Sequence, residues 1–415
     1  MSEPTVLLLS MRSVNDLVAS CALYEFEDVV QATTGAERID ATHSPAHELS
    51  RRIYKYARRY SGSRAVATSI APAPRVVRLR RDYDLFLPIF NHTHELYALA
   101  QIPEWRKHCR YAACYILELW SHLLPDYLLE LLVDFDVIFV GSCHVAEDIE
   151  RLTGRPCRFL AGGVDVLNFA PYPEAPPRTI DVCNIGRRAP LTHRALFDLM
   201  QQRRSFVYYF DTVAASGVDN RQRTYHVDSA AEHRLLFASL LQRSRYYIAN
   251  RARVNEPDLI FKGDEISNRF YEGAAAGCVM IGEPPRIEEF EREFDWPDAV
   301  IPVPFDAPEI CALIAELDAD PARLARIRRD NVYHAALRHD WAYRLQAVFE
   351  ALGLAPTRGL IVRERQLRAL AAAFKGSERV TPIVSTGVPT LDVEIEPTRA
   401  GVRTAAFEAV YRAAT

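Results

Sequence analysis

Short apolar runs alternate with stretches of helical periodicity along most of the chain. Apolar runs bounded by turn residues are typical of buried parallel strands, and apolar positions three or four residues apart are typical of the helices that cover them. In the first half, strands are expected at 5–9, 65–67, 85–90, 115–117, 137–140 and 158–160, and helices at 46–60, 94–99, 123–132 and 146–152. In the second half, strands are expected at 180–185, 205–210, 246–249, 279–281 and 300–303, and helices at 193–201, 230–242, 267–276, 308–317 and 322–352. The pattern predicts an α/β protein with two parallel sheets.

A proline-rich stretch separates the two series. The sequence FAPYPEAPPR at Phe169–Arg178 has four prolines, which do not continue a helix or a sheet ladder. We therefore expect an N-terminal Rossmann-like domain over 1–170, a linker over 171–178, a C-terminal Rossmann-like domain over 179–354 and an extension over 355–415 with a helix near 362–374. The last helix before the extension is expected to return to the first domain. Open parallel sheets bind ligands at the carboxyl ends of their strands, so the site is expected in a cleft between the domains.

Composition narrows the possible partners and the compartment. The formal net charge is −4, so no global basic field attracts nucleic acid, and no nucleic-acid partner is expected. No apolar run approaches the roughly 20 residues that cross a bilayer, which leaves peripheral membrane contact at most. The eight cysteines are scattered without a C-x-x-C pair. They are interpreted as reduced thiols in a cytoplasmic protein.

The densest chemical signal is Phe261–Gly282, with the sequence FKGDEISNRFYEGAAAGCVMIG. An acidic pair precedes a good helix N-cap at Ser267, and the run Gly273–Gly277 gives the helix a face almost without side chains. An apolar strand follows, so the helix N-terminus should open toward the cleft, where unpaired amides favour a phosphate. Glu272 lies in the first turns of this helix, where a carboxylate can accept hydrogen bonds from two vicinal hydroxyls such as those of a ribose.

This segment resembles the E-x7-E region of retaining GT-B glycosyltransferases of the family-4 type, in which the second Glu holds the nucleotide ribose. Glu272 takes that place, and the form R-x-x-E at Arg269–Glu272 looks more like a bacterial glycosyltransferase-like subgroup. Eight residues before Glu272 stands Asp264 rather than Glu, and Glu265 is one residue closer. The resemblance implies that one of these two carboxylates faces the transferred sugar.

Two further segments resemble the same family, in the same order. IDVCNIGRR at 180–188 is similar to the strand and Gly-Arg turn that open the nucleotide-binding domain, which implies that Arg187, with Arg188 second, neutralises a diphosphate beside Gly186. GGVDVLNF at 162–169 is similar to the end of the N-terminal domain. Lys262 would meet the diphosphate as the leaving group departs.

The resemblance also implies that neither a metal nor another cofactor is needed. The D-x-D sequence at Asp134 and Asp136 spells the metal motif of the other glycosyltransferase class. It precedes a predicted strand of the first domain, so it is interpreted as a helix-to-strand turn.

Two loops of the first domain follow predicted strands and should face the cleft. Asn91, His92 and His94 follow the strand at 85–90 and are assigned to the acceptor side. Glu118 and His122 follow the strand at 115–117. In retaining GT-B enzymes a His of this second loop often contacts the sugar, and Glu118 or His122 would fill that role.

The resemblance implies an enzyme of glycan biosynthesis that moves a sugar from a nucleoside-diphosphate donor to an acceptor hydroxyl, with retention at the anomeric carbon. A polysaccharide, a lipid-linked molecule and a small molecule are equally compatible acceptors. A GT-B-shaped module without activity, which binds a nucleotide or glycan or scaffolds a partner, stays open, because Asp264 departs from the motif and Ser10–Ser13 stands where a Gly-rich loop is usual. Epimerisation of a sugar nucleotide is a third hypothesis.

Overall fold

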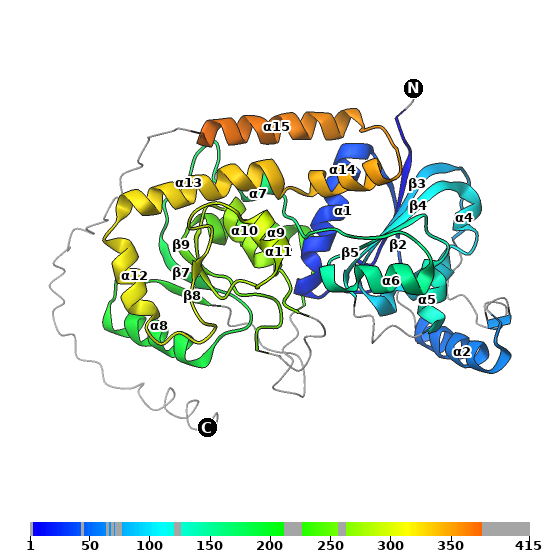
Figure 1. Cartoon of the computed structure of the whole chain (residues 1–415), viewed down its shortest axis with the longest axis horizontal. Coiled ribbons are helices and arrows are strands. Elements are labelled where there is room, and N and C mark those ends of the chain that lie inside the picture. Colours follow the sequence, from blue (N-terminus) through cyan, green and yellow to red (C-terminus); the bar gives the residue numbers. More distant parts are fainter. Residues whose placement is uncertain are drawn as a thin grey trace, which may run out of the picture. The chain divides into compact units, whose positions relative to one another are not determined.

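The computed structural model describes residues 3–42, 45–63, 66–67, 70, 77–119, 126–210, 226–255 and 263–375. Residues Met1–Ser377 form one compact unit and Glu378–Thr415 a second. The first unit contains two parallel sheets covered by helices, which is the α/β architecture that the sequence predicts (Figure 1).

The first sheet has six strands in the order β2-β1-β3-β4-β5-β6, and every pair is parallel. Its strands are β1 (Val6–Ser10), β2 (Glu37–Asp40), β3 (Tyr83–His92), β4 (Cys109–Glu118), β5 (Val137–Val140) and β6 (Cys157–Phe159). The central strands are apolar on both faces because helices cover both sides of the sheet. These helical elements are α1 (Cys21–Thr34), α2 (Pro45–Ser61), η2 (Thr93–Gln101), α4 (Trp105–His108), α5 (Asp126–Leu132), α6 (Ala146–Thr153) and α7 (Val166–Phe169).

The second sheet has five parallel strands in the order β11-β10-β9-β7-β8. Its strands are β7 (Ile180–Asn184), β8 (Tyr208–Phe210), β9 (Ser244–Ile248), β10 (Val279–Gly282) and β11 (Ile301–Pro302). It is covered by α8 (Pro190–Gln202), α9 (Ala230–Gln242), α10 (Asn268–Ala275), α11 (Glu288–Glu293), α12 (Ile310–Asp318) and α13 (Pro321–Arg338).

Helix α10 forms as its sequence predicts. Ser267 accepts a hydrogen bond from the Arg269 amide and caps the helix. A Cβ on Gly273 would lie 2.6 Å from Met280 Sδ and 2.9 Å from a ring carbon of Tyr247, so only glycine lets the helix approach strands β9 and β10 this closely. The small residues therefore let α10 pack closely on the sheet, and this packing places its first turn at the carboxyl edge.

The last helices return to the first sheet. After α13 the chain continues through α14 (Trp341–Ala351) and α15 (Arg358–Phe374), which Figure 1 shows beside α1 and α13 respectively. Trp341 stacks on Phe26 of α1 with ring centroids 4.8 Å apart. The loop after β6 is held in the same place, because the Val164 amide donates to the His339 carbonyl at 3.0 Å.

Arg363 of α15 closes this junction. Its guanidinium lies 2.6 Å from Asp165 Oδ1 and 2.8 Å from Asp340 Oδ1. Asp340 is fully buried and also accepts hydrogen bonds from the amides of Val166 and Ala342. Burial and the neighbouring Asp340 raise the pKa of Asp165, and Arg363 opposes that rise. One cation thus balances two buried carboxylates contributed by different segments.

Several sequence expectations differ from the structure. The single helix expected over 322–352 is two helices, because Asp340 caps a new helix at Trp341. The strand expected at 65–67 is wrong, since Val66 and Ala67 are helical. Strand β2 and helix α1 were not expected: β2 is an exposed edge strand with one aliphatic residue, and α1 is buried almost all round, so neither has the alternation that marks its type.

We expect Arg363→Ala to destabilise the protein by about 3–5 kcal/mol, because it leaves two buried carboxylates without their cation. Chemical denaturation of both proteins measures the difference. Arg368→Ala is the matched control on the same helix, since Arg368 pairs with Glu364 at the surface, and it should cost less than about 1 kcal/mol. Equal losses for the two variants would contradict the proposed balance of charges.

Candidate functional site

The carboxyl ends of the two sheets carry the polar residues that the sequence singles out. Glu118 is the last residue of β4, and its Oε2 lies 3.1 Å from Arg253 Nη2 in the loop after β9. His92, the last residue of β3, places Nδ1 3.5 Å from the same Glu118 oxygen. A carboxylate of the first half therefore meets a cation of the second half, with a histidine beside it.

Arg253 was not predicted from the sequence. It has a φ of 52°, in the left-handed region that residues with side chains rarely adopt. Backbone strain of this kind persists where the surrounding structure enforces it, and it gathers at functional sites. No motif marks Arg253, so only its pairing with Glu118 identifies it.

The structure separates the roles of Asp264 and Glu265. Asp264 Oδ1 lies 3.2 Å from Arg251 Nη1, and its Oδ2 accepts a hydrogen bond from the Arg286 amide at 3.0 Å. These contacts fix the loop between β9 and α10. Glu265 instead lies beside the loop of Arg253, because the Ala252 amide donates to its carbonyl oxygen at 3.0 Å, and the charges of Glu118 and Arg253 act on its carboxyl group. Of the two acidic residues, Glu265 is therefore the one in the polar cluster.

Burial raises the pKa of Glu265 to about 7, and the negative charge of Glu118 adds to the rise. The Arg253 guanidinium and the nearby Ser142 hydroxyl act in the opposite direction and lower the pKa of Glu265. A carboxyl group with a pKa near neutrality is a recurrent feature of acid–base and binding sites. The cluster can therefore hold or release one proton near pH 7.

His144 places the loop after β5 against the same segment. Its Nε2 lies 3.2 Å from the Asp264 carbonyl oxygen. A Cβ on Gly263 would lie 2.5 Å from His144 Nε2, so a side chain at Gly263 would force the imidazole away. Loops from both halves thus contact each other beside Glu265.

The predicted diphosphate loop lies at the end of β7. Gly186 has a φ of 86°, and a Cβ there would lie 2.3 Å from Arg269 Nη2. The loop therefore lies against the guanidinium of the first turn of α10. Arg187 is exposed, and Arg188 lies over the Phe210 ring with its Cζ 5.6 Å from the centroid. Gly186, Arg187, Arg188 and Arg269 are brought to one edge of the second sheet.

Glu272 belongs to a buried ion triad. Its Oε1 lies 2.5 Å from Arg234 Nη1 of α9, and Arg234 Nε lies 3.0 Å from Glu25 Oε1 of α1. The Arg234 guanidinium also lies over the Phe169 ring at 4.7 Å, and Trp341 Nε1 donates to Glu25 Oε2 at 3.0 Å. Burial raises the pKa of Glu25 and Arg234 lowers it. Neither Glu25 nor Arg234 was predicted, because they lie far from Glu272 in sequence and no local motif contains them.

The remaining predicted site residues differ in burial, and two of them are not described by the structure. Asn91 is buried, and its Nδ2 donates to Ser20 Oγ at 3.0 Å, so it holds the loop after β3 in place. His94 is exposed. Lys262 and His122 lie outside the described residues.

The D-x-D sequence lies between α5 and β5, as predicted. Asp136 accepts a hydrogen bond from the Ala112 amide at 2.8 Å and pairs with Arg106 at 2.7 Å, which is a structural role at the amino edge of the sheet. In the part of the chain that the structure describes, no group of three His, Cys, Asp or Glu side chains is placed to hold a metal ion. Within the same residues, no helix is long and apolar enough to cross a bilayer.

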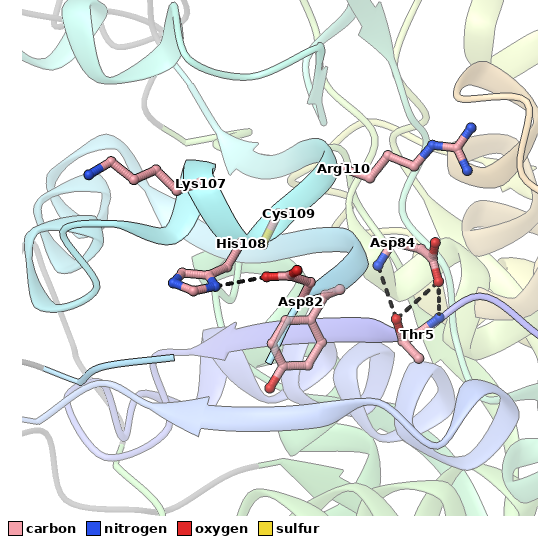
Figure 2. A pocket seen from close by; sticks show the side chains of 8 residues that line it. Thr5, Asp82, Asp84, Lys107, His108, Cys109 and Arg110 are labelled. Atoms are coloured by element: carbon pink, nitrogen blue, oxygen red, sulfur yellow. Dashed lines mark hydrogen bonds and ion pairs between the residues drawn. The ribbon is translucent and has the colours of Figure 1, made fainter. Parts of the chain in front are cut away.

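A shallow hollow lies at the opposite edge of the first sheet. Figure 2 shows His108 turned toward Asp82, with 2.9 Å between Nδ1 and Oδ1, while Asp84 bonds the Thr5 amide. The lining comes from the beginnings of β1, β3 and β4, and consists of Thr5, Asp82, Tyr83, Asp84, Lys107, His108, Cys109 and Arg110. Because ligands of parallel sheets bind at the carboxyl ends, this hollow is not the candidate site.

The comparison with protein families matches the second half of the chain. Residues 199–350 match the family model described as glycosyl transferase-like. No curated protein matches the chain.

Similar solved structures include an alpha-glucosyltransferase in complex with UDP and a 13-mer DNA, at 11% identity and a TM-score of 0.48, over 85% of this chain and 100% of that one. AviGT4, a glycosyltransferase involved in avilamycin A biosynthesis, is similar at 10% identity and a TM-score of 0.39, over 88% of this chain and 98% of that one. TarM from S. aureus is similar at 10% identity and a TM-score of 0.40 over 64% of this chain, which spans only 54% of TarM. Residues 199–350 of this α/β chain with two parallel sheets are thus similar to the glycosyl transferase-like family.

Proposed function

We propose that this chain transfers a sugar from a nucleoside-diphosphate donor to an acceptor hydroxyl, with retention at the anomeric carbon and without a metal ion. The observation that carries the proposal is the polar cluster of Glu118, Arg253 and Glu265, which joins the carboxyl edges of both sheets. A transferase needs its donor and acceptor sides to meet at one point, and this cluster lies where the two sheet edges meet. The eight free thiols fit a reducing compartment, and we place the activity in the cytoplasm.

The donor would lie along the second sheet. Arg187, Arg188 and Arg269 would balance the diphosphate beside Gly186, where the loop lies against the first turn of α10. Preorganised cations of this kind stabilise the charge of a departing leaving group. Glu272 would accept hydrogen bonds from the ribose hydroxyls, with Arg234 holding its carboxylate in place from the other side.

The transferred sugar would lie between Glu265 and Glu118. Glu265 would bind a sugar hydroxyl, since it is the acidic residue before α10 that lies in the polar cluster. Glu118, with His92 beside it, would face the acceptor hydroxyl. Arg253 contacts Glu118 and would orient that carboxylate.

A GT-B module without activity is the second candidate. The observation in its favour is that Glu272 is already occupied by an ion pair in a buried triad. Arg12 also pairs with Glu27 at 2.9 Å and with Asp28 at 2.6 Å, at the position where related enzymes have a Gly-rich loop. Nucleotide binding with no turnover would favour this candidate.

The donor site is tested by a thermal-shift panel of UDP, GDP, ADP and TDP and their common sugars. A nucleotide at a hundred times its dissociation constant should stabilise the wild-type protein by about 2.7 kcal/mol. Glu272→Gln should weaken the binding of that nucleotide at least about tenfold, because one charge-assisted hydrogen bond is worth about 1.5–3 kcal/mol.

Glu25→Gln is the matched control for Glu272→Gln. It removes the other carboxylate of the same triad, so both variants lose an ion pair with Arg234. Only Glu272→Gln should lower nucleotide affinity, whereas both should lower thermal stability. Equal affinity for the two variants and the wild type would remove Glu272 from the donor site.

Glu118→Gln should lower the rate of donor breakdown by about 100-fold or more, with nucleotide affinity unchanged, because Glu118 is assigned to the reacting side. Release of nucleoside diphosphate from the stabilising sugar nucleotide, with water as acceptor, measures the rate. Asp82→Asn, at the opposite edge of the same sheet, is the control and should behave as the wild type. If wild-type protein binds the donor but releases no diphosphate with any acceptor tried, a GT-B module without activity becomes the better hypothesis.

Glu265→Gln should change how stability depends on pH. The pKa of Glu265 is raised from 4.5 to about 7, so the folded protein binds this proton more tightly than the unfolded chain. Wild-type stability is therefore lost as the pH rises from 4.5 toward 7, and the variant lacks that loss. Above pH 7 the variant should be more stable by about 3 kcal/mol, and near pH 4 the two should be equal. Urea denaturation across this pH range measures the difference, and parallel curves would contradict the raised pKa.

A further inference from the structure

Positive charge is concentrated in one segment of the chain. Residues 49–81 contain ten Arg and Lys residues and no Asp or Glu. Taking these ten charges from the formal net charge of −4 leaves −14 for the rest of the chain. The same segment contains Tyr54, Tyr56 and Tyr60, so its cations are interleaved with aromatic residues.

Helix α2 presents part of this segment to solvent. One face of the helix is packed: the Tyr54 ring lies 5.7 Å from that of Tyr97 in η2, and Arg58 Nε lies 2.8 Å from Glu130 Oε2 in α5. Figure 1 shows α2 beside α5 at the outer side of the first half. These contacts hold the helix against the domain and fix which face is outward.

The outward face combines cations with large apolar groups. Lys55 and Arg59 are exposed there. Tyr56 is 56% exposed, Tyr60 82% and Leu49 57%. Val66 and Ile70, which follow α2 in the chain, are also exposed. Exposing so many large apolar side chains to water does not stabilise the protein. The face therefore has the composition of an interaction surface.

We propose that the outward face of α2, defined by Leu49, Lys55, Tyr56, Arg59 and Tyr60, docks on an anionic lipid surface. Lys and Arg are attracted to anionic headgroups while their aliphatic stems lie over apolar groups. Tyrosine rings partition to the boundary between headgroups and acyl chains, where one end stays wet. The cations and the tyrosines of the face thus both have a favourable place at such a surface.

The aliphatic residues favour lipid over nucleic acid. A phosphate backbone attracts the same cations, and bases stack on tyrosine. Neither of these interactions rewards exposed Leu49 or Ile70, whereas transfer into the interface does, at roughly 25 cal/mol per Å² of apolar area removed from water. The face is also on a packed convex helix, rather than in the groove that a single strand follows.

The position of α2 links this surface to the candidate site. The helix begins shortly after β2 ends, at the edge of the first sheet that also carries Glu118. It is packed against η2, which directly follows His92. Docking through α2 would therefore place the acceptor side of the first half near the membrane. The docking itself does not depend on glycosyl transfer.

The experiment is co-sedimentation of the full chain with large unilamellar vesicles. Vesicles of phosphatidylcholine alone are compared with equimolar phosphatidylcholine and phosphatidylglycerol, at low and at high salt. We expect binding to the anionic vesicles only, weakened by salt. Lys55→Gln with Arg59→Gln should weaken it roughly 25-fold, since each cation near such a surface contributes about fivefold. Tyr56→Ser with Tyr60→Ser should weaken binding at both salt concentrations.

Arg203→Gln with Arg204→Gln is the charge-matched control, because both residues are exposed on the second half after α8. It should bind the anionic vesicles as the wild type does, and thermal melts should show all variants folded. Equal binding to both kinds of vesicle, no binding to either, or an equal loss in the control would overturn the proposal. Tight binding to a duplex or single-stranded oligonucleotide that the Lys55 and Arg59 changes abolish, without vesicle binding, would assign the face to nucleic acid instead.

Discussion

The arrangement of the two halves depends on the burial of Arg234 between Glu25 and Glu272. A buried guanidinium is tolerated only with carboxylates in good geometry, because removal from water costs several kcal/mol per ion. Glu25 lies on α1 of the first half, whereas Arg234 and Glu272 lie on helices of the second. Any movement that separates α1 from α9 and α10 would leave a buried charge unpaired. The triad therefore fixes the position of the two halves relative to each other. Trp341 and Arg363, on the helices that return to the first sheet, strengthen this contact.

The relative position of the two halves determines which charged residues meet at the facing edges of the sheets. With α1 and α10 fixed, the ends of β4 and β9 are close enough for Glu118 to pair with Arg253. The same closeness buries Glu265 beside Glu118, which is why the pKa of Glu265 rises to about 7. The packing that stabilises the fold thus creates an electrostatically unfavourable carboxyl at the edge. Unfavourable buried groups of this kind are common where a protein gives up stability for function.

Local patterns in the sequence were sufficient for α10 and the second sheet. The Ser267 cap, the small residues before Gly277 and the apolar strand behind them are all short-range signals, and each forms as predicted. Long-range pairing could not be predicted in the same way. Whether Asp264 or Glu265 enters the cluster depends on contacts with Arg251 and Arg286, and Arg234 is 38 residues from its partner Glu272. The roles predicted for individual residues in binding and catalysis stay predictions.

The net charge of −4 illustrates the same limit for surfaces. Taken as one number, it argues against any attraction to anionic partners. Exposed charges more than about 8 Å apart are largely screened at physiological ionic strength, so a partner senses only the charges that lie near it. The acidic remainder of the chain cannot cancel the field of Lys55 and Arg59 at a surface that touches α2. A protein of negative net charge can therefore present a basic face, and the folded position of each charge decides which partners it attracts.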